Sequence, residues 1–214
     1  MARRCGRCIA RPPAFDRYQG ALVYAPPVSD LVMRFKFGKE RSVTRALAAC
    51  LAQHLKAIWR EPTVHQHRQA DPAADIRLPD LLVPIPLHQR RFRQRGFNQA
   101  LEIAQWLGAD LGIAVEERLI VRCVETRPQS ELSANERLRN VRNAFQLSAF
   151  GEDWKSHSPA ATVAIVDDVL TTGATAHAVS RRLKLAGVQT VLVWTPVRAY
   201  IMHPGWRRPG RSTR

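Results

Sequence analysis

Apolar positions along the chain follow two different spacings, which together predict alternating strands and helices. Short apolar runs bounded by proline or polar residues predict strands over residues 21–25, 81–86, 118–124, 162–166 and 190–194. Apolar residues that recur every three or four positions predict a helix that opens after Ser29 or Asp30, and further helices over 42–59, 98–111, 132–145 and 174–186. The segments that lack either spacing are predicted to be loops, at 61–79 and 151–160.

The order of these elements predicts the fold class. Strands that alternate with helices favour a parallel sheet with helices on both faces, which is an α/β fold. The unit from 162 to 194 carries this pattern most clearly, because Val179 and Leu183 share one helix face and Gly187 suits the end of that helix. A length of 214 residues allows one domain with an appendage, or two small domains.

The charge of the chain favours anionic partners. Lys and Arg total 33 against 18 Asp and Glu, which gives a formal net charge of +15. Such a balance suits phosphates, nucleic acid or acidic lipid headgroups. The alternative is that most of these arginines form an ordinary solvated surface.

The apolar runs and the cysteines predict the compartment. No apolar run is long enough to span a bilayer, so we expect no membrane insertion. The first residues, "MARRCGRCIARPP", carry charge without the apolar stretch of a signal peptide. The four cysteines then favour a reducing compartment without a disulfide framework, and we expect a cytoplasmic protein.

Two adjacent acids and a run of small residues follow the apolar strand at 162–166. Asp167 and Asp168 come at the end of this strand, where ligands of parallel sheets bind. The turn that follows opens a helix, whose unpaired backbone N–H groups favour an anion. Its small and hydroxyl-bearing residues allow close approach of an oxyanion and add donors: Thr171, Thr172, Gly173, Ala174 and Thr175. Because carboxylates suit sugar hydroxyls or hydrated Mg²⁺, the pattern predicts a site for a phosphorylated ribose.

Acid pairs after an apolar strand also occur in Mg²⁺-binding NTPases and in phospho-acceptor domains. The chain has neither the G-x-x-x-x-G-K-[ST] phosphate loop nor the G-x-G-x-x-G turn. A turn that served only to cap a helix would not need two acids beside such small neighbours. The ribose-phosphate interpretation is therefore favoured.

The stretch "VAIVDDVLTTGAT" at 163–175 resembles the phosphoribosyl-pyrophosphate (PRPP) motif of type I phosphoribosyltransferases. Further stretches, in the same order along the chain, resemble the ComF family, which is associated with competence for DNA uptake. These stretches are "CGRCIARPPAFD" at 5–16, "LVMRFKFGK" at 31–39, "VPIPLHQRRFRQRGFNQALEIA" at 83–104 and "TRPQSELSANERLRNVRNAF" at 126–145. The resemblance covers most of the chain and implies a type I phosphoribosyltransferase-like sheet.

The resemblance implies a role for each matching residue. Asp167 and Asp168 are expected to bind the ribose hydroxyls of PRPP with Mg²⁺ nearby, and the small-residue turn 171–175 to hold its 5′-phosphate. The loop after the second core strand is expected to hold pyrophosphate through His88, Gln89 and Arg90. A mobile loop is expected to bring positive charge to the leaving group, drawn from Arg90, Arg91, Arg93 and Arg95, of which Arg93 and Arg95 join the two aspartates as catalytic candidates. The same "RRFRQRG" run could instead be a solvated or nucleic-acid-binding basic loop.

The cysteines give a weaker prediction. Cys5 and Cys8 have the spacing of a zinc knuckle, and the ComF resemblance makes them the second half of a four-cysteine site. Zn²⁺ is therefore expected only in a longer form of the chain. Cys50 and Cys123 fall in a predicted helix and strand, where cysteine is commonly a small buried apolar residue.

These points predict three segments: a Cys-containing N-terminal remnant at 1–20, a phosphoribosyltransferase-type domain at 21–200 and a basic disordered tail at 201–214. The function predicted is that of a Mg²⁺-dependent PRPP-binding, phosphoribosyltransferase-like protein linked to uptake or use of DNA. The alternative is a non-catalytic accessory that senses PRPP or binds single-stranded DNA. A DNA-uptake protein is a further possible partner, and a homodimer would be usual for the superfamily. The hood over the acceptor is expected from residues 21–60 or 126–145.

Overall fold

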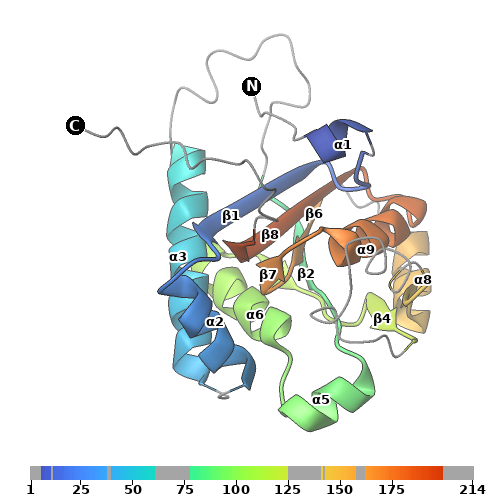
Figure 1. The fold of residues 1–214 in the computed structure, drawn as a ribbon. Coiled ribbons are helices and arrows are strands. Elements are labelled where there is room, and N and C mark those ends of the chain that lie inside the picture. Colours follow the sequence, from blue (N-terminus) through green and yellow to red (C-terminus); the bar gives the residue numbers. More distant parts are fainter. Residues whose placement is uncertain are drawn as a thin grey trace.

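The chain folds around a parallel sheet, seen in a computed structural model that describes residues 6–10, 12–37, 40–60, 78–124, 141, 143–157 and 162–199 (Figure 1). Its described strands form one path, in the order β1 (Arg17–Val23), β8 (Thr190–Arg198), β6 (Thr162–Val166), β2 (Leu81–Pro84) and β3 (Ala114–Val115), with β7 (Val169–Leu170) paired to β8. Every pair along this path is parallel. The predicted α/β class is confirmed.

Helices cover both faces of the sheet (Figure 1). On one face lie α2 (Val28–Phe37), α3 (Arg41–Arg60) and α6 (Gln99–Leu111). On the other lie α9 (Ala174–Leu185), α8 (Ala149–His157) and the hairpin of β4 (Ile120–Arg122) and β5 (Phe145–Leu147). Each face has its own apolar core, so β6 is buried on both sides. Ala164 and Val166 join one core and Val163 and Ile165 the other, which explains its continuous apolar run.

The helices predicted from apolar spacing are confirmed to within a few residues. The predicted helices at 42–59, 98–111 and 174–186 correspond to α3, α6 and α9, and α2 begins at Val28, slightly before the expected start. Local caps set the limits of α6. The Asn98 side chain accepts a hydrogen bond from Ala100 N–H at 3.1 Å, and Gly112 ends the helix with a φ of 71°.

Two strands extend beyond their predicted limits. The strand predicted at 21–25 is β1, which runs from Arg17 to Val23 beside β8. The strand predicted at 190–194 continues to Arg198 through Pro196. Proline lacks an N–H donor. On the side of β8 that faces β6 and β7, however, no residue pairs with Pro196, because β6 has ended and β7 has not begun, so no ladder bond is lost there.

Two other predictions are corrected, and one strand was missed. Residues 151–160 were expected to be a loop, whereas 149–157 form α8, because Phe150 and Trp154 lie one turn apart and pack on a core. The helix expected at 132–145 does not reach its predicted end, since Phe145 begins β5. The two-residue strand β3 was not predicted, because so short a segment has no periodicity.

Several sequence predictions lie wholly or largely outside the described residues. These are the tail at 201–214, the loop at 61–79 apart from its last residues, most of the 126–145 stretch, and Cys5. Cys8 lies in α1 (Gly6–Ala10). Cys50 and Cys123 are exposed, so the prediction that they are buried is wrong. Among the described helices, none combines the length and apolarity required to cross a bilayer.

Candidate functional site

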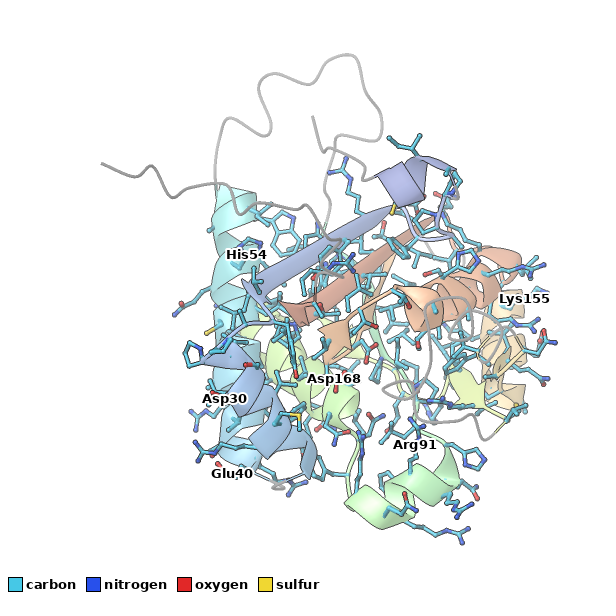
Figure 2. All side chains as sticks on the ribbon, in the orientation of Figure 1. Asp30, Glu40, His54, Arg91, Lys155 and Asp168 are labelled. Atoms are coloured by element: carbon cyan, nitrogen blue, oxygen red, sulfur yellow. The ribbon has the colours of Figure 1, made fainter. Side chains whose placement is uncertain are left out.

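The acid pair lies in a break of the central ladder. Pairing of β6 with β8 ends at Val166, and pairing of β7 with β8 resumes at Val169. Asp167 and Asp168 occupy the gap at the carboxyl end of β6, and both are half-buried. Asp168 N–H donates to Asp167 Oδ1 at 2.9 Å, and Val169 N–H donates to Asp168 Oδ1 at 2.7 Å. These bonds fix the direction of both carboxylates at the edge of the sheet, where Figure 2 labels Asp168.

The turn after β7 leads directly into α9. Gly173 is the N-cap residue and has a φ of 75°, a left-handed conformation that favours glycine. No side chain caps the helix at this residue, and no acid lies in the first turn. Ala174 N–H donates to Thr172 Oγ1 at 3.3 Å, which folds the turn back on itself. The turn and the start of α9 therefore present an electropositive helix end a few residues from the acid pair.

The end of β2 lies beside the acid pair, because Ile85 N–H donates to Val166 O at 2.9 Å. The residues that follow were expected to form a mobile loop. Instead they form the helix α5 (Gln89–Arg95), and the loop prediction is wrong. The His88 side chain accepts from Arg90 N–H at 3.4 Å, and Gly96 ends the helix with a φ of 81°. An arginine-rich run has no apolar spacing to mark a helix, so only these caps could have predicted it.

The predicted residues of this region point in different directions. Gln89 and Arg93 line a cleft of about 470 Å³ whose other walls include Leu87, Phe92, Leu101 and Glu117. Arg95 Nη1 donates to Gln99 Oε1 on α6 at 3.2 Å, which holds this side chain toward the helix. Figure 2 shows Arg91 rising from α5 toward the body of the protein. The structure thus gives Arg93 and Arg95 different surroundings.

Arg122 is a site residue that the sequence did not reveal. It ends β4, where its register partner on β5 is Phe145, and its guanidinium lies 5.3 Å from the centre of the Phe145 ring. Arg182 on α9 donates from Nε to Phe145 O at 2.8 Å, which ties the hairpin to that helix. Burial lowers the pKa of Arg122 to about 10, the Arg91 guanidinium lowers it as well, and the Asp167 carboxylate opposes them. Arg122 therefore lies close enough to both groups to interact with their charges.

The site thus gathers residues from several elements at one edge of the sheet. The structure brings together the acid pair, the turn 171–175, the end of β2, Arg91 and Arg122. Sequence reasoning found the first three because each follows a strand. Arg122 carried no such signal, since a single arginine in a short strand is most often surface charge. Within the described residues, no three His, Cys, Asp or Glu side chains are grouped so that they could hold a metal ion. Cys5 lies outside that part of the chain, so the zinc expectation stays a prediction.

The fold and these residues define an α/β protein with a small-residue turn and an acid pair at the carboxyl edge of its sheet. No protein-family model matches the sequence. It is 34% identical over 198 residues to competence protein F of Haemophilus influenzae, covering 92% of this chain and 80% of that protein. It is 36% identical over 190 residues to the DNA utilization protein YhgH of Salmonella typhimurium, covering 89% and 75%. Competence protein ComFC of Streptococcus pneumoniae is 25% identical over 181 residues, covering 85% and 68%.

These identities and coverages show that the chain belongs to the ComF family, as the sequence motifs predicted. Among solved structures, an adenine phosphoribosyltransferase from Leishmania donovani aligns with a TM-score of 0.32 and 14% sequence identity. That alignment covers 73% of this chain and 72% of the other.

Proposed function

We propose that this chain binds PRPP with Mg²⁺ and acts as a phosphoribosyltransferase-type protein in the uptake or use of DNA. The observation that carries the proposal is the contiguity of the acid pair with the turn that opens α9. Asp167 and Asp168 supply acceptors for hydroxyl groups, and the backbone around Gly173 supplies donors for a phosphate. A phosphorylated sugar matches both halves at once.

The residues present fit a Mg²⁺ ion that is held mainly by the phosphates of PRPP and by water. Mg²⁺ usually keeps several waters and takes one or two carboxylates together with substrate phosphates. Asp167 and Asp168 supply two carboxylates, and the described part of the chain has no larger acidic cluster that would form a cage. When bound there, Mg²⁺ would add positive charge beside the pyrophosphate of PRPP. The two carboxylates orient the sugar.

The arginines near the acid pair suit the leaving group. In the proposed reaction, an acceptor atom forms a bond to the anomeric carbon while the bond from that carbon to the pyrophosphate oxygen breaks. The acceptor proton passes to solvent. Negative charge then grows on the pyrophosphate, and fixed cations at that position stabilise it. Arg122 on β4 interacts with the charge of Asp167 and with that of Arg91 on α5, and we assign this role to the two arginines.

The link to DNA rests on the relatives. Their names describe a competence protein and DNA utilization proteins, and we propose the same broad role for this chain. The net charge of +15 suits a protein that works near nucleic acid.

A second candidate function is single-stranded DNA binding without catalysis. It is favoured by Trp106 on α6, which is 45% exposed and lies 4.8 Å from the Arg45 guanidinium. An exposed aromatic ring beside a cation suits stacking on bases. Salt-dependent DNA binding that survives loss of both acids but is lost in Trp106→Ala would favour this candidate.

Calorimetric titration of PRPP with Mg²⁺ tests the first candidate. Asp167→Asn and Asp168→Asn keep an oxygen that accepts the backbone N–H, so the fold should be retained. We expect each to weaken binding by about 10- to 100-fold, because a hydrogen bond to a charged group contributes about 1.5–3 kcal/mol. Asp80→Asn is the matched control, since Asp80 accepts Thr162 N–H at 2.8 Å at the opposite end of β6. Equal affinity in all four proteins, or no binding by the wild type, would refute the proposed site. Pyrophosphate release in the presence of candidate acceptors then tests catalysis.

A further inference from the structure

Residues 14–16, which we call the N-terminal strap, run alongside α9 and are anchored at both ends. At one end, Ala14 N–H donates to His177 Nδ1 at 3.0 Å. At the other, Asp16 exchanges two hydrogen bonds with Val191, one to its carbonyl at 2.8 Å and one from its N–H to Asp16 Oδ2 at 2.7 Å. Lys184 Nζ lies 2.6 Å from the same carboxylate oxygen. The strap is thus held by α9 and by the start of β8.

The middle of the strap covers the turn that opens α9. The Phe15 ring lies 3.8 Å from the point where a side chain on Gly173 would begin. Phe15 is itself half-buried and packs against the core beneath α9. Since Gly173 has no side-chain cap of its own, the ring supports one side of this turn. The backbone N–H of His177, one turn along α9, donates to the backbone carbonyl of Gly173 at 2.8 Å.

The bond from Ala14 requires an unprotonated His177 Nδ1, because a protonated nitrogen donates and cannot accept. Burial lowers the pKa of His177, and the Arg181 guanidinium one turn along the helix lowers it too. Both effects favour the neutral imidazole, and the bond that Nδ1 accepts from Ala14 N–H leaves the proton on Nε2. Among the described residues, Asp16 and Lys184 are charged groups at the other end of the strap, and they pair with each other; Arg17 follows directly in β1.

We propose that the N-terminal strap is a positioning element of the phosphate-binding turn, and that His177 is the residue through which it acts. The inference rests on the proposed function, because it concerns the site of the 5′-phosphate. Protonation of His177 would place a donor against Ala14 N–H and release this end of the strap. Phe15 would then no longer be held over Gly173, and the affinity for phosphorylated sugars would fall at acidic pH.

Two variants of His177 separate positioning from simple structural support. His177→Asn places an oxygen at the position of Nδ1, so it can accept from Ala14 N–H without titrating. His177→Leu has similar bulk without an acceptor. Calorimetric titration with PRPP and with ribose 5-phosphate, each with Mg²⁺, measures affinity at a pH above the usual histidine pKa of about 6.5 and at a series of pH values well below it, because the pKa of His177 is lowered. The protonation of the ligand phosphate cancels in the ratio of wild type to His177→Asn.

At the higher pH we expect His177→Asn to bind both ligands as the wild type does. We expect His177→Leu to bind both about 5-fold more weakly, as loss of one hydrogen bond of about 1 kcal/mol implies. On acidification, the affinity of the wild type should fall relative to His177→Asn. Phe15→Leu gives an independent measurement if His177→Leu does not fold, because it removes the ring and leaves both anchors of the strap in place. It too should weaken the binding of PRPP and of ribose 5-phosphate.

The possible failures are distinguishable. If the wild type binds neither ligand, the proposed function itself is wrong. If the wild type binds while all three variants match its affinity at every pH, the strap has no positioning role, whatever happens to the melting temperature. Parallel pH profiles of the wild type and His177→Asn would overturn the part assigned to His177.

Discussion

Replacing Arg122 with methionine should stabilise the fold and weaken PRPP binding at the same time. Burial, together with the Arg91 guanidinium, lowers the pKa of Arg122 from its usual value to about 10. Because a tenfold change in acidity corresponds to about 1.4 kcal/mol, the charge costs the folded state about 3 kcal/mol. Loss of the cation–π contact with Phe145 removes about 1 kcal/mol of stabilisation in the variant. We therefore expect the free energy of unfolding to rise by about 1–2 kcal/mol.

The pH at which this effect is measured follows from the direction of the pKa change. Below about pH 10 the guanidinium is charged in the folded and the unfolded state, so the cost is fully present. The cost disappears as pH rises above about 10 toward the usual pKa of arginine. Urea unfolding near neutral pH therefore measures it in full. Calorimetric titration should show PRPP affinity lower by about 10-fold or more, from loss of a charged hydrogen bond to phosphate.

Arg118→Met is the matched control. Arg118 also stacks on an aromatic ring, 4.0 Å from the centre of Phe150, and pairs with Glu116 at 2.8 Å. Its side chain is 65% exposed, so its charge is not buried. We expect a small loss of stability in this control and unchanged PRPP affinity. The reasoning fails if Arg122→Met loses as much stability as Arg118→Met, or if it binds PRPP as the wild type does.

Three further changes test separate parts of the fold. Gly173→Ala should lower stability by about 1–2 kcal/mol and weaken phosphate binding, because its φ of 75° strains any residue with a Cβ; unchanged thermal unfolding would contradict this. Trp194→Phe should lower the free energy of unfolding by about 1–3 kcal/mol or more, because the buried Gln19 Oε1 then loses the hydrogen bond that it accepts from the Trp194 indole N–H at 2.9 Å. Adding Gln19→Leu should recover part of this loss, as measured by urea unfolding. In the folded protein the pKa of His177 lies below its usual value of 6.5, so the unfolded chain binds a proton at this residue first as pH falls. The free energy of unfolding should therefore decrease as pH drops below about 6.5, and His177→Asn should remove that decrease.

Much of the fold could be predicted because its signals are local. The continuous run at 162–166 and the spacing of Val179 and Leu183 report burial directly. The structure buries that run between the two cores and places Val179 and Leu183 in the core beneath α9. The errors fall where a neighbour overrides the local signal. Pro196 suggested a strand end, yet β8 continues because its partner strand is interrupted beside it. Residues 151–160 were predicted to be a polar loop, yet Phe150 and Trp154 pack on a core and dock α8.

The sequence by itself determined the acid pair, the small-residue turn and the membership of the ComF family, because these lie in continuous stretches of chain. Only the tertiary structure decided what surrounds them. Ala14 and His177 are 163 residues apart, and nothing in either stretch marks their hydrogen bond. Arg122 becomes part of the site only because the β4–β5 hairpin packs on α9 and carries it toward Asp167. A motif fixes which atoms are available near one another along the chain, while charge, burial and support at the site depend on segments that only folding brings together.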